Sequence, residues 1–403
     1  MPDVVAPTGY GVGMRKLLAP LLALAVVAAA PAAHAAVQRG PGGSEAFYTP
    51  PSKLPGKNHG DPIWIRPLTG KAVLDEARTS IRVLYRSLSV SGKPIAVSGT
   101  IALPDGTPPK GGWPVISYGH GTKGIADRCA PSRGHGVLAN ENALLEAWLK
   151  RGYAIVRTDY EGLGTPGLHP FLIGRSEARG MLDMVRAARA VTGSIGRSVG
   201  LAGESQGGQA ALWAAADAKA YAPELNVRGV VTFAPISQLR QQGEAFPSID
   251  APSPNLSAYA ALIMRGLEAG NPGLDIPLSD KTRALYPFVD QDCNKRLNDG
   301  DRFAQVKPSE FFREGADLAP ILGVLEANDA GNLKIPYPVQ IAQGTADETV
   351  FKPFTDELAK ELTQNGVSLT YRVYEGAKHG NDLLGVAQVR DDALAFTKKR
   401  LGR

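Results

Sequence analysis

Cysteine is scarce in this chain of 403 residues, which contains only Cys129 and Cys293. There is no CxxC pair and no cysteine–histidine spacing suited to zinc, so we expect no metal site. Blocks of lysine and arginine are also absent, and the formal net charge is only +5, which argues against nucleic acid as a partner. Beyond the first 35 residues, no apolar run is long enough to span a bilayer.

The chain begins with the pattern of a Sec-type signal peptide. A basic segment precedes the apolar run LLAPLLALAVVAAAPAA (17–33), and the small residues of the following AHA fit cleavage before Ala36. A transmembrane anchor is the alternative, but the run is short and two prolines interrupt it. We therefore expect residues 1–35 to be a signal peptide, with Met14 as a second candidate start, and the protein to be secreted.

The remaining chain has the pattern of an α/β protein. Residues 36–80, rich in proline, glycine and polar residues at first, are predicted to form an N-terminal arm, and 81–90 and 93–104 an antiparallel hairpin. Short apolar strands then alternate with helical patterns, which indicates βαβ units and a mostly parallel sheet flanked by helices. The predicted strands are 114–119, 153–159, 198–203, 228–235, 337–344 and 368–376, and the predicted helices are 137–152, 175–191, 206–221, 354–366 and 386–401.

This alternation is interrupted once. Residues 236–335 contain helical patterns and joints rich in proline and glycine, with no good strand. Because the alternation resumes afterwards, we interpret 81–235 and 336–403 as one core and 236–335 as a mostly helical lid or cap. We recognise no long apolar stripe in this insertion.

Ser205 is the candidate nucleophile. It is the central residue of GESQG (203–207), a match to G-x-S-x-G that is weak alone but stands between a predicted buried strand and a helix of small residues. A nucleophile elbow needs this context, and it needs Gly203 and Gly207 because a Cβ at either position would collide with the neighbouring strand or helix. A serine in a glycine-flanked turn is the alternative.

A serine hydroxyl needs a base, and the base needs an orienting acid. In a chain order of serine, acid and histidine, only His379 follows Ser205 among the six histidines. The turn after strand 337–344 offers Asp347, and the adjacent Glu348 is the second choice. An N-cap role for the helix that follows is the alternative for either carboxylate.

The tetrahedral intermediate of such a reaction needs two N–H donors. We expect one from the backbone of Gln206, and the other from Thr122 in the loop after strand 114–119, where Gly121 lets the backbone approach. Export favours a Cys129–Cys293 disulfide over two free thiols. Such a bond would tie this loop to the insertion and contribute roughly 3–5 kcal/mol.

Four segments together resemble the secretory lipase family of α/β-hydrolases. They are SYGHGTKGIADRCAPS (117–132), DYEGLGTPGLHPFLIGRSEARGMLDMVRAAR (159–189), GESQGGQAALWAA (203–215) and the pair GTADETV and KHGND. The resemblance implies the α/β-hydrolase fold with a helical lid and a secreted lipase or esterase. It also implies the nucleophile at Ser205, the acid at Asp347 and the base at His379.

The expected activity is hydrolysis of carboxylic esters, triacylglycerols included, through an acyl-enzyme, a chemistry that needs no cofactor. An acyltransferase or peptidase on the same scaffold is the alternative, and a non-catalytic binding module is a third. The expected partners are an ester or lipid substrate and a lipid interface in peripheral contact. The sequence predicts no oligomeric state.

Overall fold

The computed structural model describes residues 9, 11 and 37–403, so nearly all of the predicted signal peptide lies outside the described residues. Residues 36–403 form one compact unit. Within it, nine strands form a single sheet in the order β1-β2-β3-β5-β4-β6-β7-β8-β9. The strands are β1 Pro62–Pro67, β2 Thr79–Leu88, β3 Pro94–Leu103, β4 Trp113–Gly119, β5 Ala154–Thr158, β6 Ile195–Glu204, β7 Asn226–Phe233, β8 Val339–Gly344 and β9 Leu369–Tyr374.

The sheet has an antiparallel edge and a parallel centre. β1, β2 and β3 pair antiparallel, as do β3 and β5, whereas β5, β4, β6, β7, β8 and β9 pair in parallel. β4 and β5 are buried at every position, which explains why their sequences are largely apolar and show no alternation, although Ser117, Arg157 and Thr158 are buried with them. The predicted hairpin and mostly parallel sheet are confirmed.

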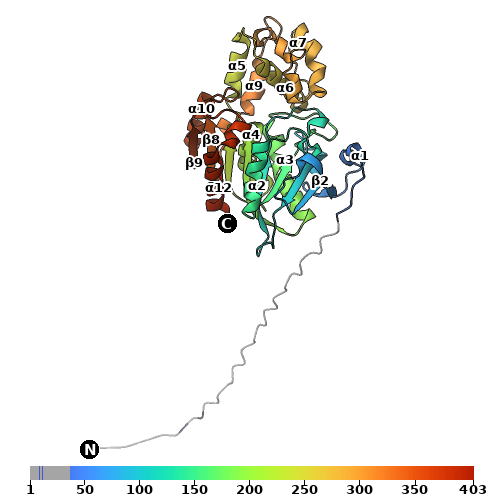
Figure 1. Cartoon of the computed structure of the whole chain (residues 1–403), viewed down its shortest axis with the longest axis vertical. Coiled ribbons are helices and arrows are strands. Elements are labelled where there is room, and N and C mark those ends of the chain that lie inside the picture. Colours follow the sequence, from blue (N-terminus) through green and yellow to red (C-terminus); the bar gives the residue numbers. More distant parts are fainter. Residues whose placement is uncertain (1–8, 10, 12–36) are drawn as a thin grey trace, which may run out of the picture. The chain divides into compact units, whose positions relative to one another are not determined.

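Helices cover both faces of the sheet (Figure 1). On one face, α3 Gly174–Val191, α4 Gln206–Tyr221 and α10 Lys352–Gln364 pack into the larger apolar core. On the other face are α2 Ala139–Lys150, α11 Asn381–Gly385 and α12 Ala387–Leu401. The predicted helices are confirmed to within a few residues at each end, and α11 is an addition.

The N-terminal arm docks on the sheet. The short helix α1 Ser44–Tyr48 buries two aromatic rings, and the indole N–H of Trp64 in β1 donates to the carbonyl O of Phe47 at 2.9 Å. Residues 62–67, which lie within the predicted arm, form the edge strand β1. Ile63 and Trp64 pack in a small apolar cluster with the aromatic rings of α1, and Ile65 packs against the larger core, so this packing sets the strand.

A helical insertion separates β7 from β8, as predicted. Its helices gather at one end of the compact unit in Figure 1. They enclose an apolar cluster that also takes in Ile125 and residues 171–173 from loops of the α/β core, and the β-structure found within the insertion is one bridge between Leu278 and Phe312. The α-helices are α5 Leu239–Ala245, α6 Pro254–Gly270, α7 Asp280–Leu285, α8 Asn294–Leu297 and α9 Ala319–Ala327, and the 3-10 helices are Phe246–Ser248, Tyr286–Asp290, Phe303–Gln305, Pro308–Glu310 and Ala330–Asn332.

Candidate active site

Ser205 lies at the turn between β6 and α4. Its backbone has φ 55° and ψ −117°, a strained conformation for a residue with a side chain. A Cβ on Gly203 would overlap the carbonyl O of Gly207, and a Cβ on Gly207 would overlap the carbonyl O of Gly119 in β4. The turn is therefore as tight as a nucleophile elbow requires, and both glycines are needed to close it.

His379 joins Ser205 to Asp347. The Nε2 atom of His379 lies 3.0 Å from Ser205 Oγ, and its Nδ1 atom lies 2.7 Å from Asp347 Oδ2. The other oxygen of Asp347 accepts the backbone N–H groups of Thr349 and Val350 at 2.9 and 2.8 Å, which fixes the carboxylate. The structure thus brings together the three side chains predicted from the sequence.

The neighbour of Asp347 points elsewhere. Glu348 is exposed, and it makes no hydrogen bond or ion pair with any residue in the range 37–403, whereas Asp347 is only 4% exposed. This difference favours Asp347 over Glu348 as the partner of His379.

Sequence reasoning did not single out Glu204, which also contacts His379. Its Oε1 lies 3.2 Å from His379 Nε2, and the side chain is buried. Burial by itself would lower the pKa of His379, but the hydrogen bond that its Nδ1–H donates to Asp347 and the negative charges of Glu204 and Asp347 outweigh it and raise that pKa above its ordinary value. No motif marks this residue, since the second position of G-x-S-x-G accepts many side chains.

The two predicted oxyanion donors face the same space. Thr122 and Gln206 line one cavity together with Ser205. The backbone N–H groups of Thr122 and Gln206 donate to no acceptor within the part of the chain that the structure describes. Gln206 is also the first residue of α4, where the helix dipole favours negative charge.

Two buried side chains fix the side chain of Gln206. Its Nε2 donates to Glu177 Oε1 at 2.7 Å and to His169 Nε2 at 3.0 Å. Burial lowers the pKa of His169 to about 4, so its ring is neutral and can accept this bond. Burial also raises the pKa of Glu177 to about 8. Neither residue had a signal in the sequence, because the contacts join α4 to positions 29 and 37 residues earlier.

Asp159 and Tyr160 hold the loop that carries Thr122. The buried carboxylate of Asp159 accepts hydrogen bonds from the hydroxyl groups of Ser98 and Ser132, and the Tyr160 hydroxyl donates to the carbonyl O of His120 at 3.1 Å. Burial and the charge of Lys123 lower the pKa of His120 to about 3, and this ring donates through Nδ1 to the carbonyl O of Gly121. These hydrogen bonds stabilise the loop that carries Thr122.

Three bonds join this loop to the insertion. Cys129 and Cys293 form a disulfide, as expected, with an S–S distance of 2.04 Å. Beside it, the backbone N–H of Asn294 donates to the carbonyl O of Lys123 at 2.9 Å, and Arg128 pairs with Asp292 at 2.8 Å. The loop with Thr122 and the cap are therefore one connected piece.

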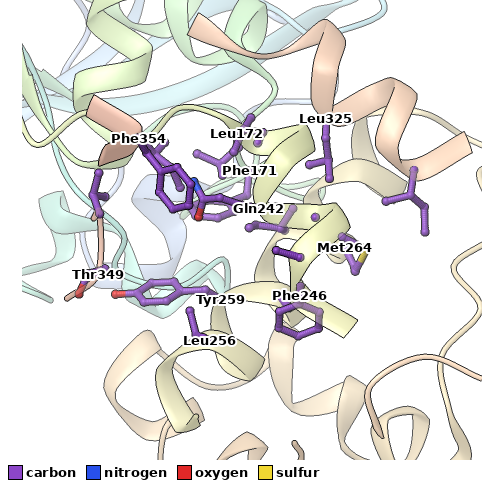
Figure 2. A pocket seen from close by; sticks show the side chains of 18 of the residues that line it. Phe171, Leu172, Gln242, Phe246, Leu256, Tyr259, Met264, Leu325, Thr349 and Phe354 are labelled. Atoms are coloured by element: carbon purple, nitrogen blue, oxygen red, sulfur yellow. The ribbon is translucent and has the colours of Figure 1, made fainter. Parts of the chain in front are cut away.

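An apolar cavity of about 170 Å³ opens above Ser205. Figure 2 shows side chains from the cap helices and from the turn 349–354 projecting into it, among them Phe246, Tyr259 and Met264. α5, α6 and α9 each contribute one short apolar face. This explains why we recognised no long apolar stripe in the sequence: the apolar surface is divided over three helices and becomes continuous only in the fold.

Among the described residues, no group of three histidine, cysteine or acidic side chains could hold a metal ion. None of the described helices is long and apolar enough to cross a membrane.

A sequence model of the secretory lipase family matches residues 136–401 of this chain. A protein named a probable inactive lipase, from Mycobacterium tuberculosis, is 27% identical over 352 residues, which cover 81% of this chain and 75% of that protein. A secreted triacylglycerol lipase of Malassezia furfur is 28% identical over 402 residues, covering 89% of this chain and 73% of the relative. Among solved structures, lipase A of Candida antarctica has a TM-score of 0.68 at 22% identity, covering 83% of this chain and 80% of that one, which shows a shared fold. The chain therefore belongs to the secretory lipase family of α/β-hydrolases and is a carboxylic ester hydrolase.

Proposed function

We propose that Ser205 is the nucleophile, His379 the general base and Asp347 the orienting acid of this ester hydrolase. The observation that carries the proposal is the chain of hydrogen bonds from Ser205 Oγ through His379 to Asp347, where the apolar cavity meets the serine. As Oγ attacks the ester carbonyl carbon, His379 Nε2 takes its proton, and the imidazolium then gives that proton to the leaving alcohol. Water then attacks the acyl-enzyme. His379 Nε2 takes a proton from the water and gives it to Ser205 Oγ as the carboxylic acid leaves.

The negative oxygen of each tetrahedral intermediate would bind between the backbone N–H groups of Gln206 and Thr122. Both groups lack another acceptor among the described residues, and both lie at the cavity that contains Ser205. Two preorganised donors at an apolar cavity stabilise developing charge more than they stabilise the neutral ester.

The apolar cavity would hold the acyl chain of the ester. Its lining is almost entirely aliphatic and aromatic, which suits a short or medium acyl chain, and a relative named as a triacylglycerol lipase supports glycerides as substrates. Phe351 lines this cavity and is 43% exposed, so it would also contact a lipid interface.

We also propose that the enzyme is exported. The support is the signal-peptide pattern over residues 1–35, the name of the matching family and the secreted relative from Malassezia furfur.

A non-catalytic binding module that keeps the fold is the second candidate, because one relative is named as inactive. The connected arrangement of Ser205, His379 and Asp347 argues for an active enzyme in this chain.

The test is hydrolysis of p-nitrophenyl butyrate, together with labelling by a fluorophosphonate probe. We expect Ser205→Ala to abolish labelling and to lower kcat by roughly 10⁶. Asp347→Asn is expected to lower kcat by about 10⁴, while the matched variant Glu348→Gln keeps the activity of the parent. Hydrolysis by Ser205→Ala at the parent rate would refute the nucleophile, and an inactive, unlabelled parent would favour the binding module.

A further inference from the structure

Glu204 places a second carboxylate at the base of the proposed triad. It is the last residue of β6 and directly precedes Ser205. Its side chain is buried, and Oε1 lies 3.2 Å from His379 Nε2, the nitrogen that also lies 3.0 Å from Ser205 Oγ. Oε1 makes no aligned hydrogen bond with any residue that the structure describes. A buried carboxylate oxygen thus faces the nitrogen that has to accept the serine proton.

The loop that carries Thr122 passes close to this carboxylate. A Cβ on Gly121 would overlap Oε2 of Glu204, whereas a Cβ on Gly380 would make only ordinary contact with Oε1, at 3.5 Å. The carboxylate therefore packs against the backbone of Gly121, in the loop of the predicted oxyanion donor.

The protonation of His379 follows from its other nitrogen. Nδ1 lies 2.7 Å from a carboxylate oxygen of Asp347, which can only accept, so Nδ1 carries a proton. In a neutral ring Nε2 is then a second acceptor, and an ionised Glu204 would face it with an acceptor at 3.2 Å. Two buried acceptors at this distance repel each other unless a proton lies between them.

Neighbouring charges do not remove the need for this proton. Burial raises the pKa of Glu204, and with the negative charges of Glu141 and Asp347 it outweighs the positive charges of His379 and Lys123, which lower that pKa. The ammonium of Lys123 lies 3.4 Å from Glu141 Oε2, so a carboxylate already pairs with it. The charge of Glu204 in turn raises the pKa of Tyr118, Tyr160 and Tyr259.

We propose that Glu204 and His379 share one proton in the resting enzyme, and that His379 becomes the base for Ser205 only after this proton has left for solvent. The inference rests on the proposed function, because it assigns His379 the role of base. Glu204 acts through His379 and is a positioning residue, since it does not line the substrate cavity.

The same carboxylate has a second effect after the proton has left. When Ser205 attacks, its proton moves from Oγ to Nε2, and the imidazolium that forms lies between the carboxylates of Asp347 and Glu204. Glu204 therefore stabilises the charge that develops on His379 in the transition state. Glu204 therefore shifts the midpoint of the activity–pH profile to higher pH, and it raises the rate on the plateau above that midpoint.

The experiment is the pH dependence of kcat/KM for p-nitrophenyl butyrate and of the rate of fluorophosphonate labelling, measured on the parent and on Glu204→Gln. For the parent, we expect half-maximal activity above pH 6.5, the ordinary pKa of histidine. Glu204→Gln is isosteric and removes the charge, so we expect its midpoint to fall by roughly 1–3 pH units. Its plateau of kcat should fall by up to about tenfold for each unit of that shift, with KM unchanged.

Glu348→Gln is the matched control, because it neutralises an exposed carboxylate that directly follows Asp347 in the sequence. We expect its midpoint to equal that of the parent. An unchanged midpoint in Glu204→Gln overturns the inference, and so does a parent midpoint at or below pH 6.5, which needs no variant to fold. Failure of the proposed function is a different result, namely a parent that is neither active nor labelled at any pH.

Discussion

Removal of the Cys129–Cys293 disulfide tests how the cap is held on the core. The two cysteines are 164 residues apart in the sequence, so the bond closes a very long loop of the unfolded chain. For a loop of that length, the chain-entropy relation gives about 5 kcal/mol at 25 °C. With an unfolding entropy of about 2.1 cal/mol/K per residue, spread over residues 37–403, this corresponds to a fall in Tm of about 6–7 °C.

The assay is calorimetric unfolding of the oxidised parent and of the variant C129A/C293A. Cys129 is fully buried, and alanine avoids leaving a buried polar group in its place. Dithiothreitol should lower the Tm of the parent to that of the variant and should leave the variant unchanged. Activity at 25 °C is expected to persist, because the bonds from Asn294 to Lys123 and from Arg128 to Asp292 still join the loop to the cap.

Two results would refute this reasoning. A Tm within about 1 °C of the parent would mean that the denatured chain is not constrained as the loop length requires. Loss of activity at 25 °C, with the fold intact by circular dichroism, would mean that the disulfide alone positions the loop that carries Thr122.

The remaining predictions concern the cavity and the buried carboxylate beneath Gln206. Ala260 on α6 lines the apolar cavity, so Ala260→Phe should reduce kcat/KM for p-nitrophenyl octanoate more than for p-nitrophenyl acetate. The difference should be about fourfold for each methylene group of the acyl chain that is excluded from the cavity. Equal losses on both esters would contradict this. Burial raises the pKa of Glu177 to about 8. The folded state therefore binds more protons than the unfolded state between about pH 4.5 and 8, and the free energy of unfolding falls as the pH rises through that window. Glu177→Gln should therefore have a flatter Tm–pH curve and exceed the parent at pH 9, and a parallel curve would count against the raised pKa.

The core of the fold can be predicted because its signals are local. β4 and β6 read as buried strands, and α4 begins at the predicted residue because the elbow glycines fix where β6 ends. β1 is different, since its pairing with β2 comes from packing on the aromatic rings of α1, and residues 62–67 alone carry no alternating pattern. Tertiary contacts override local preference at such an edge strand.

The active-site residues also divide into those with a local sequence signal and those placed by tertiary contacts. His379 is accessible to sequence reasoning because chain order leaves a single eligible histidine, and the turn after β8 leaves only two carboxylates to choose between. Glu204, Glu177 and His169 are not accessible in this way. Each gains its role by burial against residues distant in the sequence, and a lone buried carboxylate has no spacing that a motif can record.

Two buried carboxylates affect the enzyme differently as the pH rises, Glu204, which directly precedes Ser205, and Glu177, which accepts a hydrogen bond from the side chain of Gln206. Loss of the proton shared by Glu204 and His379 would increase activity, whereas ionisation of Glu177 beneath Gln206 would decrease stability. The working range would then be limited at low pH by catalysis and at high pH by the support of the oxyanion site. The two limits can be separated by Glu177→Gln, which should change the stability profile and leave the midpoint of the activity profile where it is in the parent. Glu204→Gln should move that midpoint, and because burial also raises the pKa of Glu204, it should flatten the stability profile as well. A shift of the activity midpoint in Glu177→Gln would contradict this separation.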